Sequence, residues 1–354
     1  MRRIYLIRHG HPAFPLGAHV CLGRTDTPLG PLGRMQAVVL GEAMRDTAFG
    51  AVFTSPLTRC RETAAPLGRE VIPEAELAEQ DMGPWDGLDF AEIRARWPEL
   101  HARRAAEPLL VPPGAESFAA VQVRAMRALE RCLERSEGDI ALVAHATVIQ
   151  TLLARVEGIP LEESRPLRPP YTGCAVLGRD GGACMLVRAA FTPTAPLTPK
   201  LAEELLRAAA PGAAVMAHCR AVAAEALRIA EALPLPLDRE QLESAALLHD
   251  CARGEAEHAR LGAAWLRELG YEQAAALVER HHDLEAAELD EAAVLYLADK
   301  LVREDKRVGL EERFAASALR CTTPQARASH ARRLETARRL KTEINDCCGR
   351  EVVV

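Results

Sequence analysis

Two histidines in this chain directly follow short apolar runs, a position from which a side chain can take part in chemistry. His9 comes after residues 4–7 and Arg8, and His145 comes after residues 140–144. Four or five consecutive apolar residues are typical of strands that are buried on both faces of a parallel sheet. Because ligands bind at the carboxyl ends of such strands, we expect both imidazoles at one ligand-binding edge.

A third predicted strand, residues 52–54, leads into a helix that carries an arginine. Ser55 is expected to be the N-cap of this helix and Pro56 its first residue, which places Arg59 in or near the first turn. Helix N-termini attract anions, and a guanidinium group can bond two phosphate oxygens at once. The sequence therefore predicts an arginine positioned for a phosphate.

A fourth motif is the loop at residues 77–87, in which Glu79 precedes Gly83 and an aromatic residue. The Arg-His-Gly strand end, the Ser-Pro-Leu helix start, this acidic loop and the second strand ending in histidine follow one another in the order found in one family. The pattern resembles the histidine phosphatase superfamily, which is phosphoglycerate-mutase-like, over roughly residues 1–191. The resemblance implies an α/β domain with a mostly parallel sheet flanked by helices.

The same resemblance implies a role for each of five residues. His9 would be the nucleophile, forming a phosphohistidine that water later hydrolyses. Arg8, Arg59 and His145 would hold the non-bridging phosphate oxygens. Glu79 would protonate the leaving oxygen and then help to activate water. Such a domain uses no cofactor.

The turn-rich loop at residues 23–33 contains a Gly-Arg-Thr-Asp sequence. Similar loops lie close to the pocket in small phosphatases of this superfamily, so Arg24 and Thr25 are candidates to contact the substrate. The alternative is a solvated loop in which Thr25 or Asp26 caps a turn.

A proline-rich segment, residues 192–200, divides the chain. Three prolines in nine positions cannot continue a helix or a central strand, and they favour an extended linker. We therefore expect a first domain at residues 1–191 and a second at residues 201–354. Strand signals are missing from the second domain, which is predicted to be all-helical with a helical C-terminal extension.

Five of the eleven histidines of the chain, together with two aspartates, lie near predicted helix ends in the second domain. Imidazole and carboxylate ligands suit iron, manganese, cobalt or zinc. The pattern His, His-Asp, His, His-His, Asp resembles the HD superfamily of metal-dependent phosphohydrolases, particularly its branches with two-metal centres. One or two ions are therefore expected. The residues concerned are His218, His249, Asp250, His258, His281, His282 and Asp299.

The resemblance implies that His218, His249 and Asp299 hold one metal, with Asp250 bridging to the second. His258 and either His281 or His282 would complete that second site.

Two of these assignments have alternatives. Adjacent helical residues point about 100° apart, so His281 and His282 can both bind only if the helix ends there. Otherwise one of them is a polar surface residue, and His258 has the same alternative. Arg253 stands where many HD hydrolases carry a lysine. It keeps the charge and could contact a phosphate, but it cannot readily give a proton.

Composition excludes several functional classes. A length of 354 residues suggests two domains, and 49% hydrophobic with 27% charged residues is globular. The net charge of −6, without a dense basic block, argues against nucleic acid as a partner. We find no apolar stretch of membrane-spanning length and no signal peptide. The ten cysteines include no CxxC pair, which favours a reducing, cytoplasmic location.

The sequence thus predicts a bifunctional phosphohydrolase. The first half would hydrolyse a small phosphorylated metabolite or nucleotide, such as a sugar phosphate or α-ribazole phosphate. The short span between Glu79 and His145 favours phosphomonoester hydrolysis over mutase chemistry. The second half would cleave a nucleotide or dinucleotide. In the alternative, the second half is a catalytically silent module that senses metal or nucleotide, or that forms a homodimer, and regulates the phosphatase.

Overall fold

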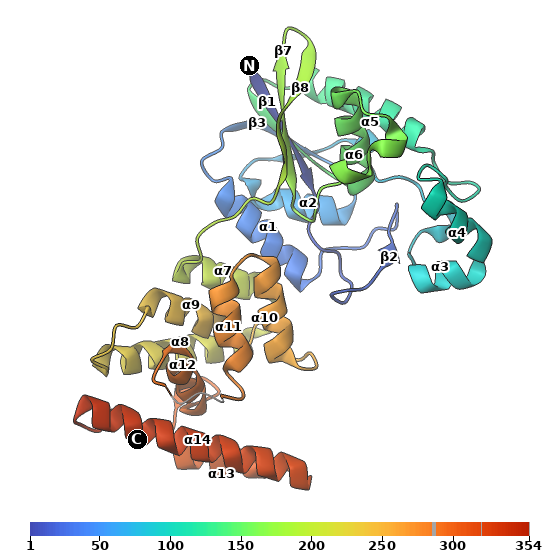
Figure 1. Cartoon of the computed structure of the whole chain (residues 1–354). Helices are drawn as coiled ribbons and strands as arrows, with labels where there is room; N and C mark the ends of the chain where they lie inside the picture. Colours follow the sequence, from blue (N-terminus) through green and yellow to red (C-terminus); the bar gives the residue numbers. More distant parts are fainter. Residues whose placement is uncertain (285–287, 320, 354) are drawn as a thin grey trace. The chain divides into compact units, whose positions relative to one another are not determined.

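The structure is a computed structural model that describes residues 1–284, 288–319 and 321–353 (Figure 1). The chain forms two compact units, Met1–Ala195 and Pro196–Val354. The first is an α/β unit and the second is built almost entirely from helices, which confirms the predicted fold class.

A six-stranded sheet organises the first unit, with the strand order β4-β3-β6-β1-β7-β8. The first four of these strands run parallel, and β7 and β8 are antiparallel. Their bounds are β1 (Arg2–Arg8), β3 (Phe49–Thr54), β4 (Val71–Pro73), β6 (Asp139–Ala144), β7 (Cys174–Asp180) and β8 (Ala183–Phe191).

The register of the central strands places three chain segments at one edge. Arg8 of β1 pairs with Ala144 of β6, and Thr54 of β3 pairs with Val143 of β6. Because parallel strands deliver their next residues to the same side, the segments after β1, β3 and β6 leave the sheet side by side.

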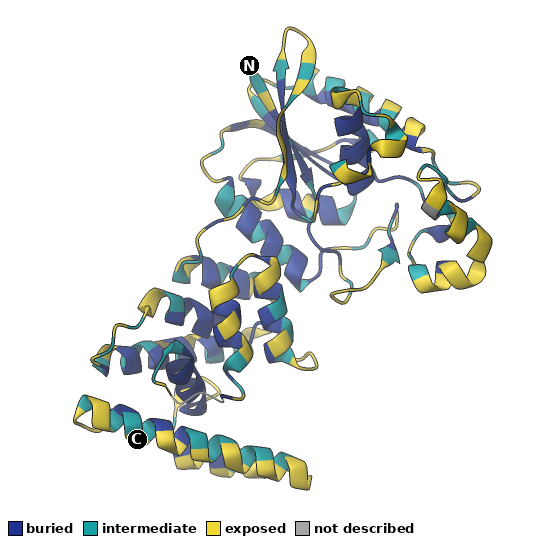
Figure 2. Cartoon of the chain, viewed as in Figure 1, coloured by how far each residue is buried: buried dark blue, intermediate teal, exposed yellow. Residues whose placement is uncertain are grey.

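Helices cover both faces of this sheet. Ile4 and Leu6 lie in an apolar cluster with residues of α5 and α6, whereas Ile7 lies in a second cluster with residues of α1 and α2. All three side chains are fully buried, which explains the unbroken apolar run in β1 (Figure 2). The bounds are α1 (Pro31–Ala43), α2 (Thr58–Ala64), α5 (Phe118–Glu134) and α6 (Ala146–Glu157).

The prediction for the start of α2 was wrong. The helix begins at Thr58 with Leu57 as its N-cap, so Ser55 and Pro56 precede it. The carboxylate of Asp26 accepts hydrogen bonds from the backbone N and Oγ1 of Thr58, at 2.6 and 2.8 Å. A carboxylate distant in sequence therefore caps this helix in place of the local serine. Arg59 still falls in the first turn.

Shorter elements complete the first unit. A small apolar cluster of Cys21, Met82, Trp85 and Ile93 joins those between residues 20 and 106 that lie near Trp85. The shorter elements are β2 (Val20–Cys21), β5 (Leu88–Asp89), α3 (Phe90–Arg96), α4 (Pro98–Ala106) and the 3₁₀ turns Ala65–Leu67, Ala75–Leu77, Gly83–Trp85, Leu161–Glu163 and Arg165–Leu167.

The second unit surrounds one buried helix, α12 (Glu291–Lys300), in which every residue from 292 to 300 is buried. The unit also contains a pair of two-residue strands, β9 (Val302–Arg303) and β10 (Lys306–Arg307), which the predicted all-helical pattern did not include. The other helices are α7 (Pro199–Ala209), α8 (Ala213–Ala232), α9 (Arg239–Leu248), α10 (His258–Glu268), α11 (Glu272–Arg280), α13 (Leu310–Ala318) and α14 (Pro324–Cys348). Within the described residues, no helix combines the length and the apolarity needed to cross a membrane.

Gly33 of α1 packs against the segment that follows His9. A Cβ atom added at Gly33 would lie 2.0 Å from the carbonyl oxygen of His11. We expect Gly33→Ala to lower the free energy of unfolding of the first unit by about 1–3 kcal/mol, because backbone would have to move. Urea unfolding would measure this. Gly309→Ala, where a Cβ meets nothing within 4 Å, is the control and should cost less than Gly33→Ala.

Candidate functional sites

The two strand-end histidines of the first unit lie side by side. The ring centroids of His9 and His145 are 5.1 Å apart and their planes meet at 63°. The backbone N of His9 donates to the carbonyl of Ala144 at 3.0 Å, so the register of β1 and β6 sets this separation. Both side chains are buried. The structure thus brings together the pair that the two apolar runs predict.

Hydrogen bonding leaves one nitrogen of His9 available for attack. Its Nδ1 lies 2.7 Å from the carbonyl of Gly10, and since a carbonyl only accepts, Nδ1 carries the proton. Burial, with the nearby charges of Arg59 and Arg8, lowers the pKa of His9 well below its ordinary value. The ring is therefore neutral near pH 7, and Nε2 keeps its lone pair.

His145 is held by the residue expected to cap α2. Its Nε2 lies 2.7 Å from Ser55 Oγ and 3.4 Å from Cys60 Sγ. Burial and the charge of Arg59 lower the pKa of His145 well below its ordinary value. The hydroxyl of Ser55 thus orients the imidazole of His145 and does not cap α2.

Arg8 is a half-buried cation stacked on a tyrosine. Its guanidinium carbon lies 3.9 Å from the ring centroid of Tyr171, and Nη1 donates to the carbonyl of Pro169 at 3.0 Å. Burial lowers the pKa of Arg8 to about 10, so the group stays charged. Its Nε is buried and has no hydrogen-bond partner among the described residues.

Arg59 is held through the loop that follows β2. Its Nη1 and Nη2 donate to the carbonyls of Thr25 and Gly23, at 2.8 and 2.7 Å. Burial lowers the pKa of Arg59. Its Nε, like that of Arg8, is buried without a partner in the described part of the chain. Two buried N–H groups therefore remain for an anion.

One carboxylate fixes the shape of this loop. Asp86 accepts the backbone N–H groups of Gly23, Arg24 and Thr25, at 2.7 to 2.9 Å. The Arg24 side chain turns toward other carboxylates, with Glu116 3.4 Å away. The loop thus positions Arg59 through its carbonyls, while contact of Arg24 or Thr25 with a substrate stays a prediction.

Glu79 is buried close to His145. Its Oε1 accepts from the backbone N of Gln80 at 2.9 Å, and Oε2 accepts from the backbone N of Thr147 at 3.4 Å. Thr147 lies in the first turn of α6, two residues after His145. The carboxylate is therefore held at the N-terminus of the helix that follows the second histidine.

A buried arginine holds the backbone on both sides of Glu79. Arg124 of α5 donates to the carbonyls of Glu76, Ala78 and Glu79, at 2.6, 2.5 and 3.1 Å. Its charge is balanced by Glu116, whose carboxylate accepts from Nε and Nη2 at 2.7 and 2.9 Å. We call this arrangement the Arg124 clamp. No sequence pattern pointed to this role of Arg124.

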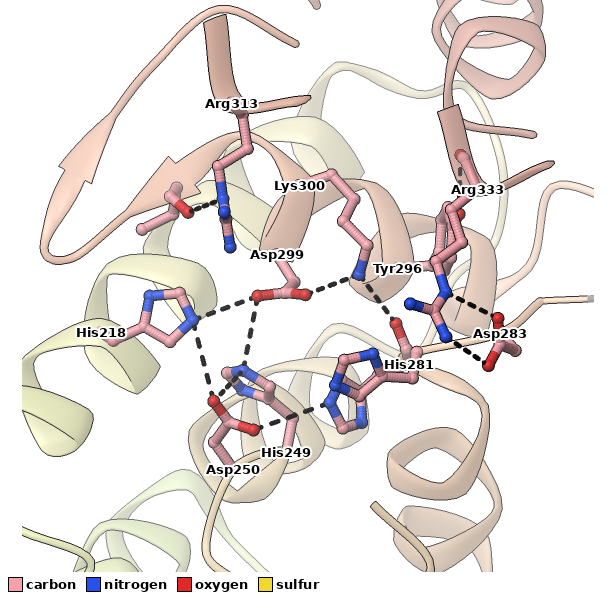
Figure 3. Close-up of polar contacts among 12 residues, drawn as sticks. His218, His249, Asp250, His281, Asp283, Tyr296, Asp299, Lys300, Arg313 and Arg333 are labelled. Atoms are coloured by element: carbon pink, nitrogen blue, oxygen red, sulfur yellow. Dashed lines mark hydrogen bonds and ion pairs between the residues drawn. The ribbon is translucent and has the colours of Figure 1, made fainter. Parts of the chain in front are cut away.

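In the second unit, three histidines share one orientation. Each donates its Nδ1 hydrogen to a backbone carbonyl, so each turns its Nε2 toward the interior (Figure 3). The pairs are His218 with Glu304 at 2.8 Å, His249 with Ala246 at 2.7 Å, and His281 with Val278 at 2.6 Å.

The three Nε2 atoms face two aspartates. His218 Nε2 lies 3.1 Å from Asp299 Oδ1, and His249 Nε2 lies 3.8 Å from the same oxygen. His281 Nε2 lies 3.7 Å from Asp250 Oδ1. Nitrogen lone pairs and carboxylate oxygens repel one another unless a proton or a cation lies between them.

His258 and His282 extend the cluster. His258 Nε2 lies 3.1 Å from Asp250 Oδ1 and 3.1 Å from His282 Nε2. Since α11 ends at Arg280, His281 and His282 are not constrained to diverge as helical neighbours, and both face the cluster. Ligand atoms lie within 4.8 Å of one another in three overlapping groups: His218, His249 and Asp299; His249, Asp250 and His281; His258, His281 and His282.

These residues fit divalent metal. The Nε2 of His249 is buried and has no hydrogen-bond partner among the described residues. Burial would raise the pKa of Asp250, but the neighbouring His249, a hydrogen bond with His258 and the charge of Arg253 together hold it well below its usual range. Burial would also raise the pKa of Asp299, but the charge of Lys300, the hydrogen bond with His218 and the nearby His249 and His281 together hold it well below its usual value. Charged carboxylates with inward nitrogens form a ligand set suited to transition metals.

Two residues near the sites escaped the sequence analysis. Lys300 is buried and pairs with Asp299 at 2.7 Å, although the two are neighbours in sequence. Its place directly after a candidate ligand was the available signal. Tyr171 follows two prolines in an irregular segment, and no spacing pointed to it.

Comparison with known proteins agrees with this geometry. Residues 4–192 match the model of the histidine phosphatase superfamily, branch 1. The chain belongs to the histidine phosphatase superfamily. Residues 215–304 match the HD domain model. A histidine phosphatase domain and an HD domain are therefore joined in one chain, which confirms the predicted pairing.

Named relatives cover mainly the histidine phosphatase domain. Bifunctional protein Rv2228c of Mycobacterium tuberculosis is 36% identical over 157 residues, which are 43% of this chain and 43% of that protein. This chain thus spans less than half the length of that relative. Glucosyl-3-phosphoglycerate phosphatase of the same organism is 31% identical over 174 residues, covering 45% and 77%. The solved structure of mycobacterial hydrolase 2 is 28% identical, covers 59% of this chain and 97% of that one, and has a TM-score of 0.50.

The lowered pKa values of His9 and His145 predict acid-sensitive folding. Above pH 6.5 both rings are neutral in the folded and in the unfolded chain. Below pH 6.5 the unfolded chain binds protons that the folded chain excludes. The free energy of unfolding therefore decreases as the pH is lowered. We expect His9→Gln to reduce the slope by about 1.4 kcal/mol per pH unit. Urea unfolding at pH 5 to 7 in a Trp265→Phe chain, whose remaining Trp85 and Trp97 report the first unit, measures this.

His19 provides the control because it is exposed in the same unit. His19→Gln should leave the pH dependence unchanged. An equal slope in the His9→Gln chain and the parent chain would show that His9 is not held neutral.

Proposed function

We propose that the first unit hydrolyses a small phosphomonoester through a phosphohistidine on His9. The observation that carries this proposal is the unprotonated Nε2 of His9 beside two guanidinium groups whose buried Nε atoms lack partners among the described residues. A nucleophile and an anion site in one buried place are what phosphoryl transfer requires.

Two displacements at phosphorus follow from this arrangement. In the first, a bond forms between His9 Nε2 and phosphorus as the ester P–O bond breaks, and Glu79 gives its proton to the leaving oxygen. In the second, water attacks phosphorus, the N–P bond breaks, and the water proton passes to Glu79. Arg8, Arg59 and His145 hold the non-bridging oxygens throughout. The backbone hydrogen bonds to Glu79 keep its carboxylate beside the reacting centre.

The substrate class is a small phosphorylated metabolite. One relative is named glucosyl-3-phosphoglycerate phosphatase, and another, from Arabidopsis thaliana, metal-independent phosphoserine phosphatase at 28% identity. These names support sugar phosphates and small phosphorylated acids ahead of nucleotides or α-ribazole phosphate.

For the second unit we propose metal-dependent hydrolysis of a nucleotide or dinucleotide phosphoester. His218, His249 and Asp299 would hold one ion, Asp250 would bridge, and His258 with His281 or His282 would hold a second. When bound, the metal supplies Lewis-acid stabilisation and activation of water. Lys300 orients Asp299 through the oxygen that faces away from His218, and Arg253 orients Asp250 through Oδ2.

A regulatory role for the second unit is the alternative. Arg253 occupies the position of a lysine in many HD hydrolases, and its Nη1 is 2.9 Å from Asp250 Oδ2. A guanidinium held by a ligand carboxylate cannot give a proton. Under this alternative the unit binds metal or nucleotide without turnover, or forms a homodimer.

All ten cysteines are free, which supports a cytoplasmic location.

Two substitutions separate the activities. We expect His9→Ala to lower chelator-resistant hydrolysis of p-nitrophenyl phosphate by about 10³-fold or more, because the nucleophile is lost. It should leave manganese-dependent nucleotide hydrolysis unchanged. Asp250→Ala should lower manganese-dependent nucleotide hydrolysis and leave chelator-resistant hydrolysis of p-nitrophenyl phosphate unchanged. Mass-spectrometric metal analysis should show lower metal content only in Asp250→Ala. Bound metal without turnover of any nucleotide would favour regulation, and loss of both activities by either change would contradict independence.

The Arg124 clamp predicts a dependence on the leaving group. Arg124→Met should release the backbone beside Glu79 and weaken proton donation. We expect kcat/KM for glycerol phosphate to fall by about 10- to 100-fold. Hydrolysis of p-nitrophenyl phosphate should change little, because its leaving group departs without a proton.

Arg127 supplies the control from the same helix. It is exposed and pairs with Glu76 at 2.6 Å. Arg127→Met should affect both substrates equally and weakly. An equal loss on both substrates in Arg124→Met would mean that the clamp supports folding alone.

A further inference from the structure

A cavity of about 880 Å³ opens over the metal-ligand cluster of the second unit, with His218, Asp250 and Asp299 among its lining. Another part of the lining comes from α13 and the first turns of α14. The HD match ends at residue 304, so these helices lie outside the matched domain. The volume suits a whole small molecule rather than a lone phosphate.

Among the described residues, five lysine and arginine side chains line the cavity, and they differ in how they are bound. Arg253, Lys300 and Arg333 each pair with an aspartate, at 2.7 to 2.9 Å. Arg303 is about half exposed and lies 3.8 Å from Glu312. The first three serve carboxylates of the protein, and the fourth is largely in water.

Arg313 is the exception among these cations. Its Nε donates to the carbonyl of Val302 at 3.1 Å, and the side chain is half-buried. No other described residue makes a hydrogen bond or ion pair with its two Nη groups. Figure 3 shows the side chain extending from α13 toward Asp299 and His218. A guanidinium anchored at Nε presents its two Nη groups in a fixed geometry that matches two phosphate oxygens.

The imidazole of His330, on α14, also lines the cavity. Its hydrogen-bond partner is Ser317, which lies on α13 one helical turn after Arg313. Ser317 Oγ donates to the carbonyl of Phe314 at 3.0 Å, so at 2.8 Å from His330 Nε2 it accepts that nitrogen's hydrogen. His330 Nδ1 is therefore the acceptor nitrogen. Phe314 packs edge-on against the imidazole, at 5.1 Å and 68°. The imidazole is thus held in place as a half-buried flat surface lining the cavity.

We propose that α13 and the start of α14 form a ligand-binding wall for a nucleoside phosphate. Arg313 binds the phosphate next to the metal-ligand cluster, and His330, held by Ser317 and Phe314, contacts the base. This inference rests on the proposed metal-dependent function of the second unit and assigns its specificity to residues outside the HD match.

Calorimetric binding to the full chain tests the wall. The parent is the His9→Ala chain with manganese, and the probes are inorganic phosphate and the AMP phosphonate in which methylene replaces the bridging oxygen, which cannot be hydrolysed. We expect Arg313→Gln to weaken binding of both probes by about 10- to 100-fold. Arg313→Lys should recover part of the loss. His330→Ala should weaken binding of the phosphonate by about 3- to 10-fold and leave phosphate binding unchanged.

Arg339→Gln on α14 is the matched control and should change neither affinity, because Arg339 pairs with Glu343 outside the cavity. Absence of metal from the purified parent chain, measured by mass spectrometry, would contradict the proposed function itself. If metal-loaded protein binds neither probe, or binds both equally well, the ligand-binding wall is wrong while the proposed metal-dependent function stands. Unchanged affinities in Arg313→Gln and His330→Ala would lead to the same conclusion.

Discussion

Both sites depend on one constraint: groups that repel one another are buried together, and only a ligand of opposite charge makes the arrangement favourable. In the first unit the half-buried guanidinium group of Arg8 and the fully buried one of Arg59 lie beside the neutral rings of His9 and His145. Backbone carbonyls and Tyr171 offset part of the cost of burying these cations. A phosphate dianion would offset the rest, so the fold is arranged around the charge of its proposed substrate.

The second unit applies the same constraint with the charge reversed. Asp250 and Asp299 are buried among imidazole nitrogens whose hydrogens point outward to backbone carbonyls. Lys300 stabilises Asp299 through the oxygen that faces away from His218 and His249, and Arg253 stabilises Asp250 through Oδ2. A divalent cation would complete the balance. The first unit therefore holds cations and the second holds carboxylates by similar means. In both, backbone groups form hydrogen bonds with the site residues, and the protein itself provides too little opposite charge to neutralise the site.

Much of the catalytic geometry follows from strand register, which sequence patterns reveal well. A short apolar run with no alternation is typical of a strand covered on both faces, and such strands lie side by side and parallel. His9 and His145 were therefore predictable as neighbours. The histidine and aspartate pattern of the second unit was similarly informative, because few residue types bind transition metals and helix ends bring them together.

Contacts between segments far apart in the chain were not predictable. Local rules made Ser55 a helix cap, but its hydroxyl meets His145 across the sheet edge, and Asp26 caps the helix instead. Arg124 reads as an ordinary residue of an amphipathic helix until the loop around Glu79 is seen against it. Sequence periodicity reports which face of an element is buried, so the residue types and strand order could be inferred from the chain. Which polar groups meet at that face depends on the paths of loops, which have no periodicity, and only the folded structure decided it.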